Sequence, residues 1–259
     1  MPRVRQTVLV VPCFNEERRL DLDAFRAFRS AHAAVEFLFV NDGSRDGTLR
    51  LLQELQSSDP DGFHLLDLPR NGGKAEAVRQ GILAGMARNP EVVGFWDADL
   101  ATPLVELDSF LDVLRARPEI DMVFAARVRL MGREISRRPS RHYVGRMGAT
   151  LISTSLGLAV YDTQCGAKLF RVTATLGQLF TAPFLSRWIF DVEIIARFVA
   201  LVGRDAAAAA IYELPVMRWR DVAGSKVQSR DFLRALRDLY RIHRAYSSSP
   251  KDRVKSRAD

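Results

Sequence analysis

Two carboxylates, Asp97 and Asp99, stand one residue apart at the end of the apolar segment VVGFWDA. Two like charges this close raise each other's energy unless a positive group lies between them. Carboxylate oxygens with no His or Cys nearby suit Mg²⁺ or Mn²⁺, and such an ion is usually completed by water and substrate phosphates. The pair therefore predicts a divalent cation that is bound by Asp97 and Asp99 and carries a nucleoside diphosphate.

Strand alternation supports this prediction. Side chains at i and i+2 of an extended segment point to the same face, so the two aspartates would converge on one site. Ala98 between them is small and leaves room for a ligand against the backbone. The alternative is a pair of solvated loop carboxylates without a ligand.

Three more polar segments each follow a predicted strand. PCFNEE follows TVLVV, NDGSRDGT follows EFLFV, and RNGGKAEAV follows FHLLDL. In an open α/β sheet the carboxyl ends of the strands line the ligand crevice. Together with the aspartate pair, these segments predict one ligand site at that edge of the sheet.

Asp42 and Lys74 are the clearest additional candidates in these segments. Asp42 ends its strand, where its carboxylate can accept hydrogen bonds from a base or a ribose. Alternatively, Asp42 and Ser44 form a turn and cap the helix that starts near Asp46; the two roles are compatible if Asp46 caps the helix and Asp42 binds the ligand. Lys74 follows two glycines and opens a helix, a position that favours anions. The loop lacks the spacing of a P-loop, so its location supports it more than its pattern does.

The elements that must position these side chains alternate along the first half of the chain. Strand patterns fall at residues 7–11, 36–40, 63–68, 92–98 and 121–127, and helix patterns at 22–34, 47–58, 73–89 and 104–117. This alternation predicts an α/β fold with a mostly parallel central sheet and helices on both faces.

The second half of the chain is less regular. Residues 127–142 indicate a basic loop, 143–158 an apolar segment and 161–170 a turn. Helices are predicted at 186–203 and 230–246, a strand at 211–219 and a disordered tail at 247–259. Without a repeat or a linker, we expect one domain over residues 1–246, with a donor half at about 1–127 and an acceptor half at about 128–246.

Composition limits the class of protein. The 259 residues are 47% hydrophobic and 27% charged, as in ordinary globular proteins, and the net charge of +7 favours anionic partners. Cys13 and Cys165 form no CxxC pattern, which predicts neither a disulfide framework nor a zinc site and favours a cytoplasmic location. The longest uncharged stretch, 147–161, is too short to span a membrane, although a segment can still lie on its surface.

Four segments in order, VVPCFNEE, VNDGSRDGT, RNGGKAEAVRQGI and DADLATP, resemble the nucleotide-sugar half of family 2 glycosyltransferases, which have the GT-A fold. The segments DTQCGAKLF and RWIFDVEII, with Trp219 and the triplet 224–226, resemble the dolichyl-phosphate β-glucosyltransferase branch; polyprenyl-phosphate mannosyltransferases are more distant. The likeness covers residues 6–230, roughly, but the relatives often have Gly and Phe where this chain has Leu100 and Ala167.

The resemblance implies inverting transfer of one hexose, with glucose from UDP-glucose preferred, to a polyprenyl or dolichyl phosphate at a membrane surface. It implies Mg²⁺ or Mn²⁺ as cofactor, with Asp99 as the chief metal ligand and a catalytic residue. The donor ligands that it implies are Pro12, Asn15, Glu16, Asp42, Lys74, Asp97 and Asp99, and Ala98 lies among them.

On the acceptor side, a phosphate is already ionised near neutral pH, whereas a hydroxyl acceptor would need a base. Asp191 is the candidate catalytic residue in either case, as a base or by orienting a sugar hydroxyl. Alternatively its carboxylate only stabilises a helix N-terminus. The expected acceptor ligands are Arg127, Arg138, Asp162, Gln164, Ser225 and Lys226. For Asp162 and Gln164, a core turn around a buried thiol is the other interpretation.

Two segments are candidates for membrane contact, namely residues 143–161 and the helix at 230–246, whose arginines recur opposite Leu236, Leu239 and Tyr240. That helix could equally pack its apolar stripe on the sheet. A soluble acceptor or GDP-mannose as donor would keep the same fold. A nucleic-acid-binding protein explains the charge but not the carboxylates, so we expect no nucleic-acid partner. The oligomeric state is left open.

Overall fold

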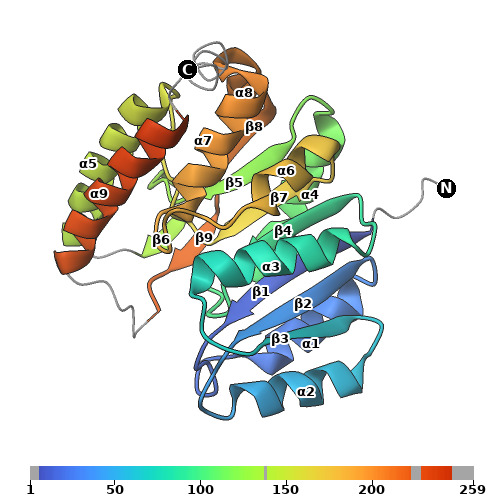
Figure 1. The fold of residues 1–259 in the computed structure, drawn as a ribbon. Helices are drawn as coiled ribbons and strands as arrows, with labels where there is room; N and C mark the ends of the chain where they lie inside the picture. Colours follow the sequence, from blue (N-terminus) through green and yellow to red (C-terminus); the bar gives the residue numbers. More distant parts are fainter. Residues whose placement is uncertain (1–5, 137–138, 223–228, 247–259) are drawn as a thin grey trace, which may run out of the picture.

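A seven-stranded sheet runs through the centre of the molecule in the order β3-β2-β1-β4-β7-β5-β8 (Figure 1). The structure is a computed structural model that describes residues 6–136, 139–222 and 229–246, without the side chains of 139–147 and 229–233. The strands of this sheet are β1 (Thr7–Cys13), β2 (Val35–Asp42), β3 (Phe63–Leu68), β4 (Val92–Trp96), β5 (Met122–Ala126), β7 (Ala167–Arg171) and β8 (Ile211–Pro215). A separate parallel pair is formed by β6 (Glu134–Ser136) and β9 (Arg218–Arg220).

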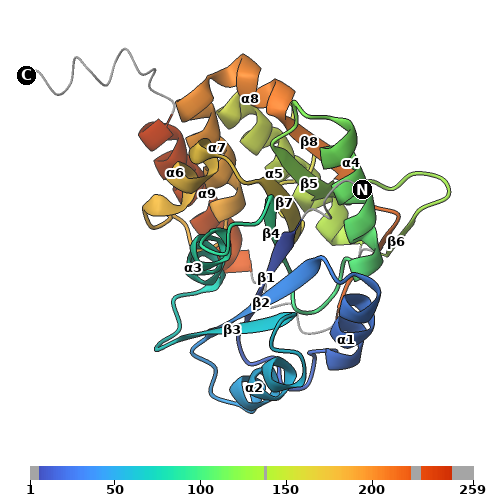
Figure 2. The ribbon, with the colours of Figure 1, turned by 90° about the vertical axis from the view of Figure 1, so that its right-hand side faces the viewer.

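The helices form layers on both faces of the sheet, as the sequence predicts. They are α1 (Leu22–Ala31), α2 (Thr48–Ser58), α3 (Lys74–Met86), α4 (Leu107–Ala116), α5 (Pro139–Leu156), α6 (Ala174–Thr181), α7 (Phe190–Val202), α8 (Arg204–Ala210) and α9 (Ser229–Tyr246), with a short 3₁₀ turn at Leu104–Glu106. Figure 2 shows α1 and α4 on one side of the sheet and α3, α6, α7 and α9 on the other.

Alternation along the strands produces the two cores. In β1, Leu9 and Val11 pack with α1, α2 and α4, whereas Val8 and Val10 pack against α3. This period of two is the pattern of a strand that is buried on both faces. The expected α/β fold, a mostly parallel sheet between two helical layers, is confirmed.

One central strand was not predicted. Residues 161–170 were expected to form a turn, but Ala167–Arg171 is β7, which lies antiparallel between β4 and β5. The sequence of β7 does not show the apolar pattern of a buried strand, because Lys168, whose side chain lies on the α7 side of the sheet, is charged although it is fully buried. The turn prediction therefore holds only for the residues before Ala167.

Other elements of the second half also differ from the sequence prediction. Within the expected basic loop, residues 134–136 form β6, and α5 begins at Pro139, a residue that suits the first helical position. Helices α6 and α8 were not predicted, and α7 begins at Phe190 instead of residue 186. The expected tail at 247–259 lies outside the described residues.

The topology brings the ends of several strands to one edge. β1, β2 and β4 are parallel neighbours, so their carboxyl ends share this edge. Ala167, the first residue of the antiparallel β7, is paired with Trp96, the last residue of β4. The segment that precedes β7 therefore meets the segment that follows β4.

Among the described helices, none has both the length and the apolar character that are needed to cross a bilayer.

Candidate active site

Asp97 and Asp99 lie in a tight turn after β4. The strand ends at Trp96, and the Asp97 N–H donates to the Gly166 carbonyl oxygen at 2.9 Å. The Leu100 N–H donates to the Asp97 carbonyl at 3.1 Å, and Leu100 adopts φ 49°, in the left-handed region. This turn, and not strand alternation, places the two carboxylates, so that part of the sequence argument is wrong.

The two carboxylates share one electrostatic environment with Lys74. Burial, followed by the charge of Asp97, raises the pKa of Asp99 above its ordinary value. The Lys74 Nζ lies 2.5 Å from Asp97 Oδ1. Burial lowers the pKa of Lys74, but Asp97, Asp191 and Asp99 outweigh it, and the pKa lies above its ordinary value. One lysine therefore interacts with three of the predicted carboxylates.

Asp42 is almost fully buried and holds the glycine-rich loop that precedes α3. Its Oδ1 accepts from the Gly72 N–H at 2.7 Å, and its Oδ2 accepts from the Gly73 N–H at 2.8 Å and from Asn71 Nδ2 at 2.9 Å. Burial raises the pKa of Asp42 despite these bonds. The observed role is thus to position the loop that presents Lys74, and a contact with a base or ribose stays a prediction.

Asn15 and Glu16 connect the loop after β1 to the loop after β2. Asn15 has φ 54°, and its Oδ1 accepts from the Arg45 N–H at 2.8 Å. The Glu16 N–H donates to Thr48 Oγ1 at 2.8 Å, and its carboxylate accepts from Arg19 Nε at 2.9 Å. Pro12 is the penultimate residue of β1, just before the first of these loops. These predicted donor ligands therefore line the same edge as Asp42.

Asp191 is buried in the first turn of α7, and an ammonium group contacts it. The Lys168 Nζ lies 2.6 Å from Asp191 Oδ1. Burial raises the pKa of Asp191, and Lys168 is the strongest of the groups that oppose this shift. The nearby Glu193 instead forms a buried ion pair with Arg197 at 2.7 Å, away from Asp191.

Arg127 and Asp162, predicted as separate acceptor ligands, bind each other. Arg127 Nε donates to Asp162 Oδ2 at 2.6 Å, and Arg127 Nη2 donates to Asp162 Oδ1 at 2.8 Å. The guanidinium also lies 5.2 Å from the ring centre of Trp219. Gln164 is half-buried, and its N–H donates to Asp162 Oδ1 at 3.1 Å. The observed bonds make this group a brace for the segment before β7, and its contact with an acceptor stays a prediction.

The remaining predicted acceptor ligands, Arg138, Ser225 and Lys226, lie outside the described residues. Conversely, sequence reasoning assigned no role to Gly166 and Lys168, although both lie in the segment DTQCGAKLF. A Cβ on Gly166 would lie 1.9 Å from Asp97 Oδ2, so this position has no room for a side chain. For Lys168, the signals were its place in that segment and the presence of a charge inside the apolar stretch AKLF.

The residues at this edge fit a divalent cation that a substrate helps to bind. Within the described ranges, no group of three or more His, Cys, Asp or Glu side chains is arranged to hold a metal alone. Mg²⁺ and Mn²⁺, however, commonly use one or two carboxylates plus substrate phosphates. Asp97 and Asp99 supply such a pair, and Lys74 already provides a positive charge beside it. The donor set therefore fits the predicted cofactor.

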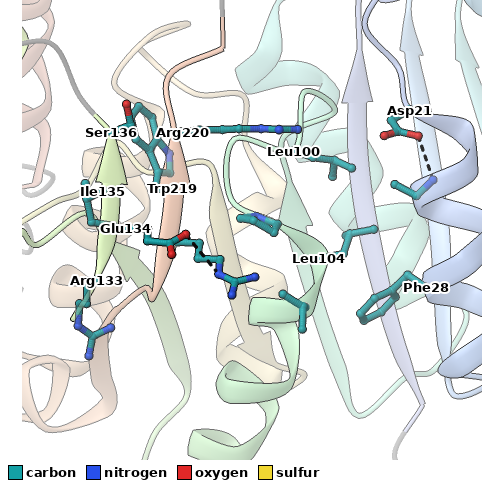
Figure 3. Close-up of a pocket in the computed structure, with 14 residues that line it drawn as sticks. Asp21, Phe28, Leu100, Leu104, Arg133, Glu134, Ile135, Ser136, Trp219 and Arg220 are labelled. Atoms are coloured by element: carbon teal, nitrogen blue, oxygen red, sulfur yellow. Dashed lines mark hydrogen bonds and ion pairs between the residues drawn. The ribbon is translucent and has the colours of Figure 1, made fainter.

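An open groove of about 860 Å³ adjoins the acidic turn (Figure 3). Figure 3 shows it between α1, which contributes Phe28, and the β6–β9 pair, which contributes Trp219 and Arg220, with Leu100 and Leu104 between them. Its lining is mostly apolar, with arginines on the β9 wall. Leu100 is the residue of the acidic turn that lines this groove, whereas Asp97 and Asp99 do not line it.

Comparison with protein families and curated proteins gives consistent matches. A profile of glycosyl transferase family 2 matches residues 8–176. Dolichyl-phosphate beta-glucosyltransferase ALG5C of Trichomonas vaginalis is 31% identical over 249 residues, which are 91% of this chain and 70% of that protein. The human dolichyl-phosphate beta-glucosyltransferase is 30% identical over 239 residues, covering 86% of this chain and 70% of the relative.

Solved structures share the fold at lower identity. Glucosyl-3-phosphoglycerate synthase of Mycobacterium tuberculosis, solved with Mn²⁺, UDP-glucose and phosphoglyceric acid, superposes with a TM-score of 0.64 at 18% identity over 95% of this chain and 81% of that one. The mannosyltransferase PcManGT of Pyrobaculum calidifontis, solved with GDP-Man and Mn²⁺, gives a TM-score of 0.63 at 16% identity over 95% of this chain and 66% of that one. The chain therefore has the GT-A fold of these proteins.

Proposed function

Because the chain belongs to glycosyl transferase family 2, we propose that it transfers a hexose from a nucleoside-diphosphate sugar to a polyprenyl or dolichyl phosphate at a membrane surface. Glucose from UDP-glucose is the preferred donor, since the relatives at about 30% identity are named as dolichyl-phosphate beta-glucosyltransferases. The structural observation that carries the proposal is the acidic turn, with Lys74 against Asp97, at the edge where four predicted donor segments meet.

In this proposal Asp97 and Asp99 hold Mg²⁺ or Mn²⁺ together with the donor diphosphate. The bound ion would stabilise the negative charge that develops on the leaving diphosphate. Lys74 would bind the same diphosphate, because its ammonium group lies 2.5 Å from the carboxylate of Asp97. Pro12, Asn15, Glu16 and Asp42 would surround the nucleoside.

Asp191 is the proposed group that faces the acceptor. A phosphate acceptor needs no strong base, so Asp191 would orient a hydroxyl of the transferred sugar or accept a proton from it. Its position in the first turn of α7, within electrostatic reach of Lys74, supports a place beside the anomeric carbon. Arg127, Arg138, Asp162, Gln164, Ser225 and Lys226 remain the proposed acceptor ligands.

Two features support an acceptor with an apolar chain. The groove beside Leu100 is mostly apolar and has arginines on one wall, a combination that suits a lipid phosphate. Helix α9 exposes Leu236 and Tyr240 among its arginines, which suits the surface of an anionic membrane. A small soluble acceptor would require neither feature.

The test is a panel of UDP-sugars and GDP-mannose, assayed with and without a polyprenyl phosphate by release of nucleoside diphosphate. We expect turnover with UDP-glucose that depends on both Mg²⁺ or Mn²⁺ and the lipid phosphate. Lipid-independent transfer to a small alcohol or acid would instead establish a soluble acceptor, and preference for GDP-mannose would change the donor.

Asp99→Ala is expected to abolish transfer and leave the protein folded, because it removes the chief proposed metal ligand and one hydrogen bond, from the Ala101 N–H, while the backbone hydrogen bonds of the turn remain. Loss of one electrostatic stabiliser typically reduces the rate by about 100-fold or more. Circular dichroism checks the fold, and titration calorimetry with Mn²⁺ and UDP checks binding. Metal-dependent turnover that survives in Asp99→Ala would place the metal elsewhere.

A further inference from the structure

Lys168 is a fully buried lysine in the middle of the central sheet. It is the second residue of β7, and its neighbours Ala167 and Leu169 pack on the opposite face of the sheet, toward α4. Its own side chain lies on the α7 side, with Nζ 5.1 Å from the ring centres of both Phe95 and Phe124. An ammonium group is thus placed where the surrounding core is aromatic.

Such burial is costly unless the charge is compensated. Two oxygens compensate it, Asp191 Oδ1 at 2.6 Å and the Cys165 carbonyl oxygen at 2.6 Å. The faces of the two phenylalanine rings add a favourable interaction with the cation. A core that served stability alone would be about as stable with apolar side chains in place of both Lys168 and Asp191, since buried ion pairs seldom exceed hydrophobic replacements in stability.

The two partners of Lys168 belong to different parts of the site. Asp191 opens α7, on the acceptor side. Cys165 precedes Gly166, whose carbonyl oxygen accepts from the N–H of Asp97 in the acidic turn. One ammonium group therefore joins the helix that carries Asp191 to the segment that seats Asp97.

We propose that Lys168 is a positioning residue, which fixes the carboxylate of Asp191 relative to the acidic turn by holding its Oδ1 and leaves Oδ2 for the substrate. This inference rests on the proposed function, in which Asp191 faces the acceptor. The fixed geometry matters for rate because a catalytic group that is displaced by about 1 Å can lose about 100-fold in activity.

The chain offers a matched control on α7, the helix that carries Asp191. Arg197 and Glu193 of α7 form a buried ion pair at 2.7 Å that does not touch Asp191 or the acidic turn. Lys168→Met and Arg197→Met each remove the cation of a buried pair and keep a long apolar side chain. Both are expected to lower the melting temperature, so a stability effect alone does not separate them.

Activity separates the two variants when each is assayed well below its melting temperature. Lys168→Met is expected to lose about 100-fold in kcat with an unchanged Kd for UDP and Mn²⁺, whereas folded Arg197→Met keeps kcat within about threefold. Lys168→Arg, which retains a cation, should recover part of kcat. Should Lys168→Met be unfolded at every assay temperature, Lys168→Arg and the Asp191→Asn background below provide the same comparison.

A double-mutant cycle with Asp191→Asn decides whether Lys168 acts through Asp191. In the Asp191→Asn background, Lys168→Met (or Lys168→Arg) is expected to reduce kcat by no more than about threefold further. Equal losses in both backgrounds, or wild-type kcat in Asp191→Asn, would overturn the positioning role and leave the glycosyltransferase proposal intact. A wild-type protein that transfers no sugar from any donor in the panel would overturn both.

Discussion

At the residue scale, the position of Asp97 depends on the absence of a side chain at Gly166. The Asp97 N–H donates to the Gly166 carbonyl oxygen, and an added Cβ would meet the carboxylate of Asp97 at 1.9 Å. The carboxylate therefore rests directly on the backbone of the segment before β7. Any group larger than hydrogen at this position must displace one of the proposed metal ligands.

We expect Gly166→Ala to reduce kcat/KM by about tenfold or more, because relieving an overpacked contact costs about 1–3 kcal/mol. Steady-state kinetics and the Kd for UDP with Mn²⁺ measure the effect.

Gly177→Ala is the control, since a Cβ there meets nothing within 4 Å. Alanine is a better helix former than glycine, so this change in α6 should raise the free energy of unfolding by up to about 1 kcal/mol and leave kcat/KM unaltered. Wild-type kinetics in Gly166→Ala would show that Asp97 is not held as described.

Interactions between residues that are close in the sequence were easier to predict than interactions between residues that are far apart in it. Asp46 was expected to cap the helix that follows it; the N-cap of α2 is Gly47, one residue later, and Asp46 Oδ1 accepts from the Thr48 N–H at 3.1 Å. Arg127 was expected to bind a phosphate at the end of its strand; that contact stays a prediction, and the observed partner is Asp162, which lies 35 residues further along the chain. No local pattern encodes that pairing.

At the element scale, the first half of the fold followed from the sequence because each strand is parallel and is followed by a helix. The predicted range of β3, residues 63–68, agrees with the structure, and β1, β2, β4 and β5 differ only at their ends. The second half did not follow, since β7 reverses direction in the centre of the sheet and has a lysine where the pattern needs an apolar residue. The short β6 and α8 offer too few residues for a periodic signal.

Glu36 connects three elements near the opposite end of β2. Its carboxylate accepts from Arg88 Nε at 2.9 Å, lies 3.0 Å from His64 Nε2, and accepts from Gln6. Burial raises the pKa of Glu36, but the bonds from Gln6 and Arg88 outweigh it, so the pKa lies below its ordinary value of 4.5. The folded state thus prefers the ionised form.

Because the pKa of Glu36 is lowered in the folded state, its contribution to the free energy of unfolding depends on pH. A lowered pKa contributes stability that is fully present above the unfolded value of 4.5 and is lost as pH falls through the folded value. We expect Glu36→Gln to lower the free energy of unfolding by about 1–2 kcal/mol at neutral pH and by progressively less below that range. Urea unfolding at several pH values measures the difference.

The matched control is Glu54→Gln, which removes an exposed carboxylate that pairs with Arg50 on α2. Exposed pairs of this type contribute about 0.5 kcal/mol or less. A Glu36→Gln deficit that stayed constant from pH 7 to pH 3 would contradict the assigned pKa direction.

At the scale of the whole molecule, α9 has one face that packs on the protein and one exposed face that carries arginines. The inner face of α9 includes Leu239 and Ile242, which pack into the core beside α7 and α5 instead of on the sheet as one expectation had it. Its outer face exposes Leu236 and Tyr240 among Arg234, Arg237, Arg241 and Arg244. Packing on the protein and contact with a membrane are therefore compatible.

We expect the protein to bind vesicles that contain anionic lipid, and to release them at high salt. Replacing Arg237, Arg241 and Arg244 with Glu should reduce binding by about 100-fold or more, because each basic residue near such a surface contributes about 1 kcal/mol. Vesicle sedimentation at low and high ionic strength measures the loss.

An equal charge change on the other face is the control. Arg26, Arg50 and Arg115 are exposed on α1, α2 and α4, and their replacement with Glu alters the net charge by the same amount. If both triple variants lost binding equally, total charge rather than α9 would govern attachment.

The strand β7 is hydrogen-bonded to β4 on one side and to β5 on the other, so the sheet is unbroken from the donor segments to the acceptor segments. A hinge motion that separated these two parts would have to break the backbone hydrogen bonds between β7 and a neighbouring strand each time the site opened. The backbone beneath the proposed site is therefore continuous across both halves of the chain. In the proposed reaction, we expect the substrates to enter and leave through movement of the loops at the sheet edge and not through separation of the two halves.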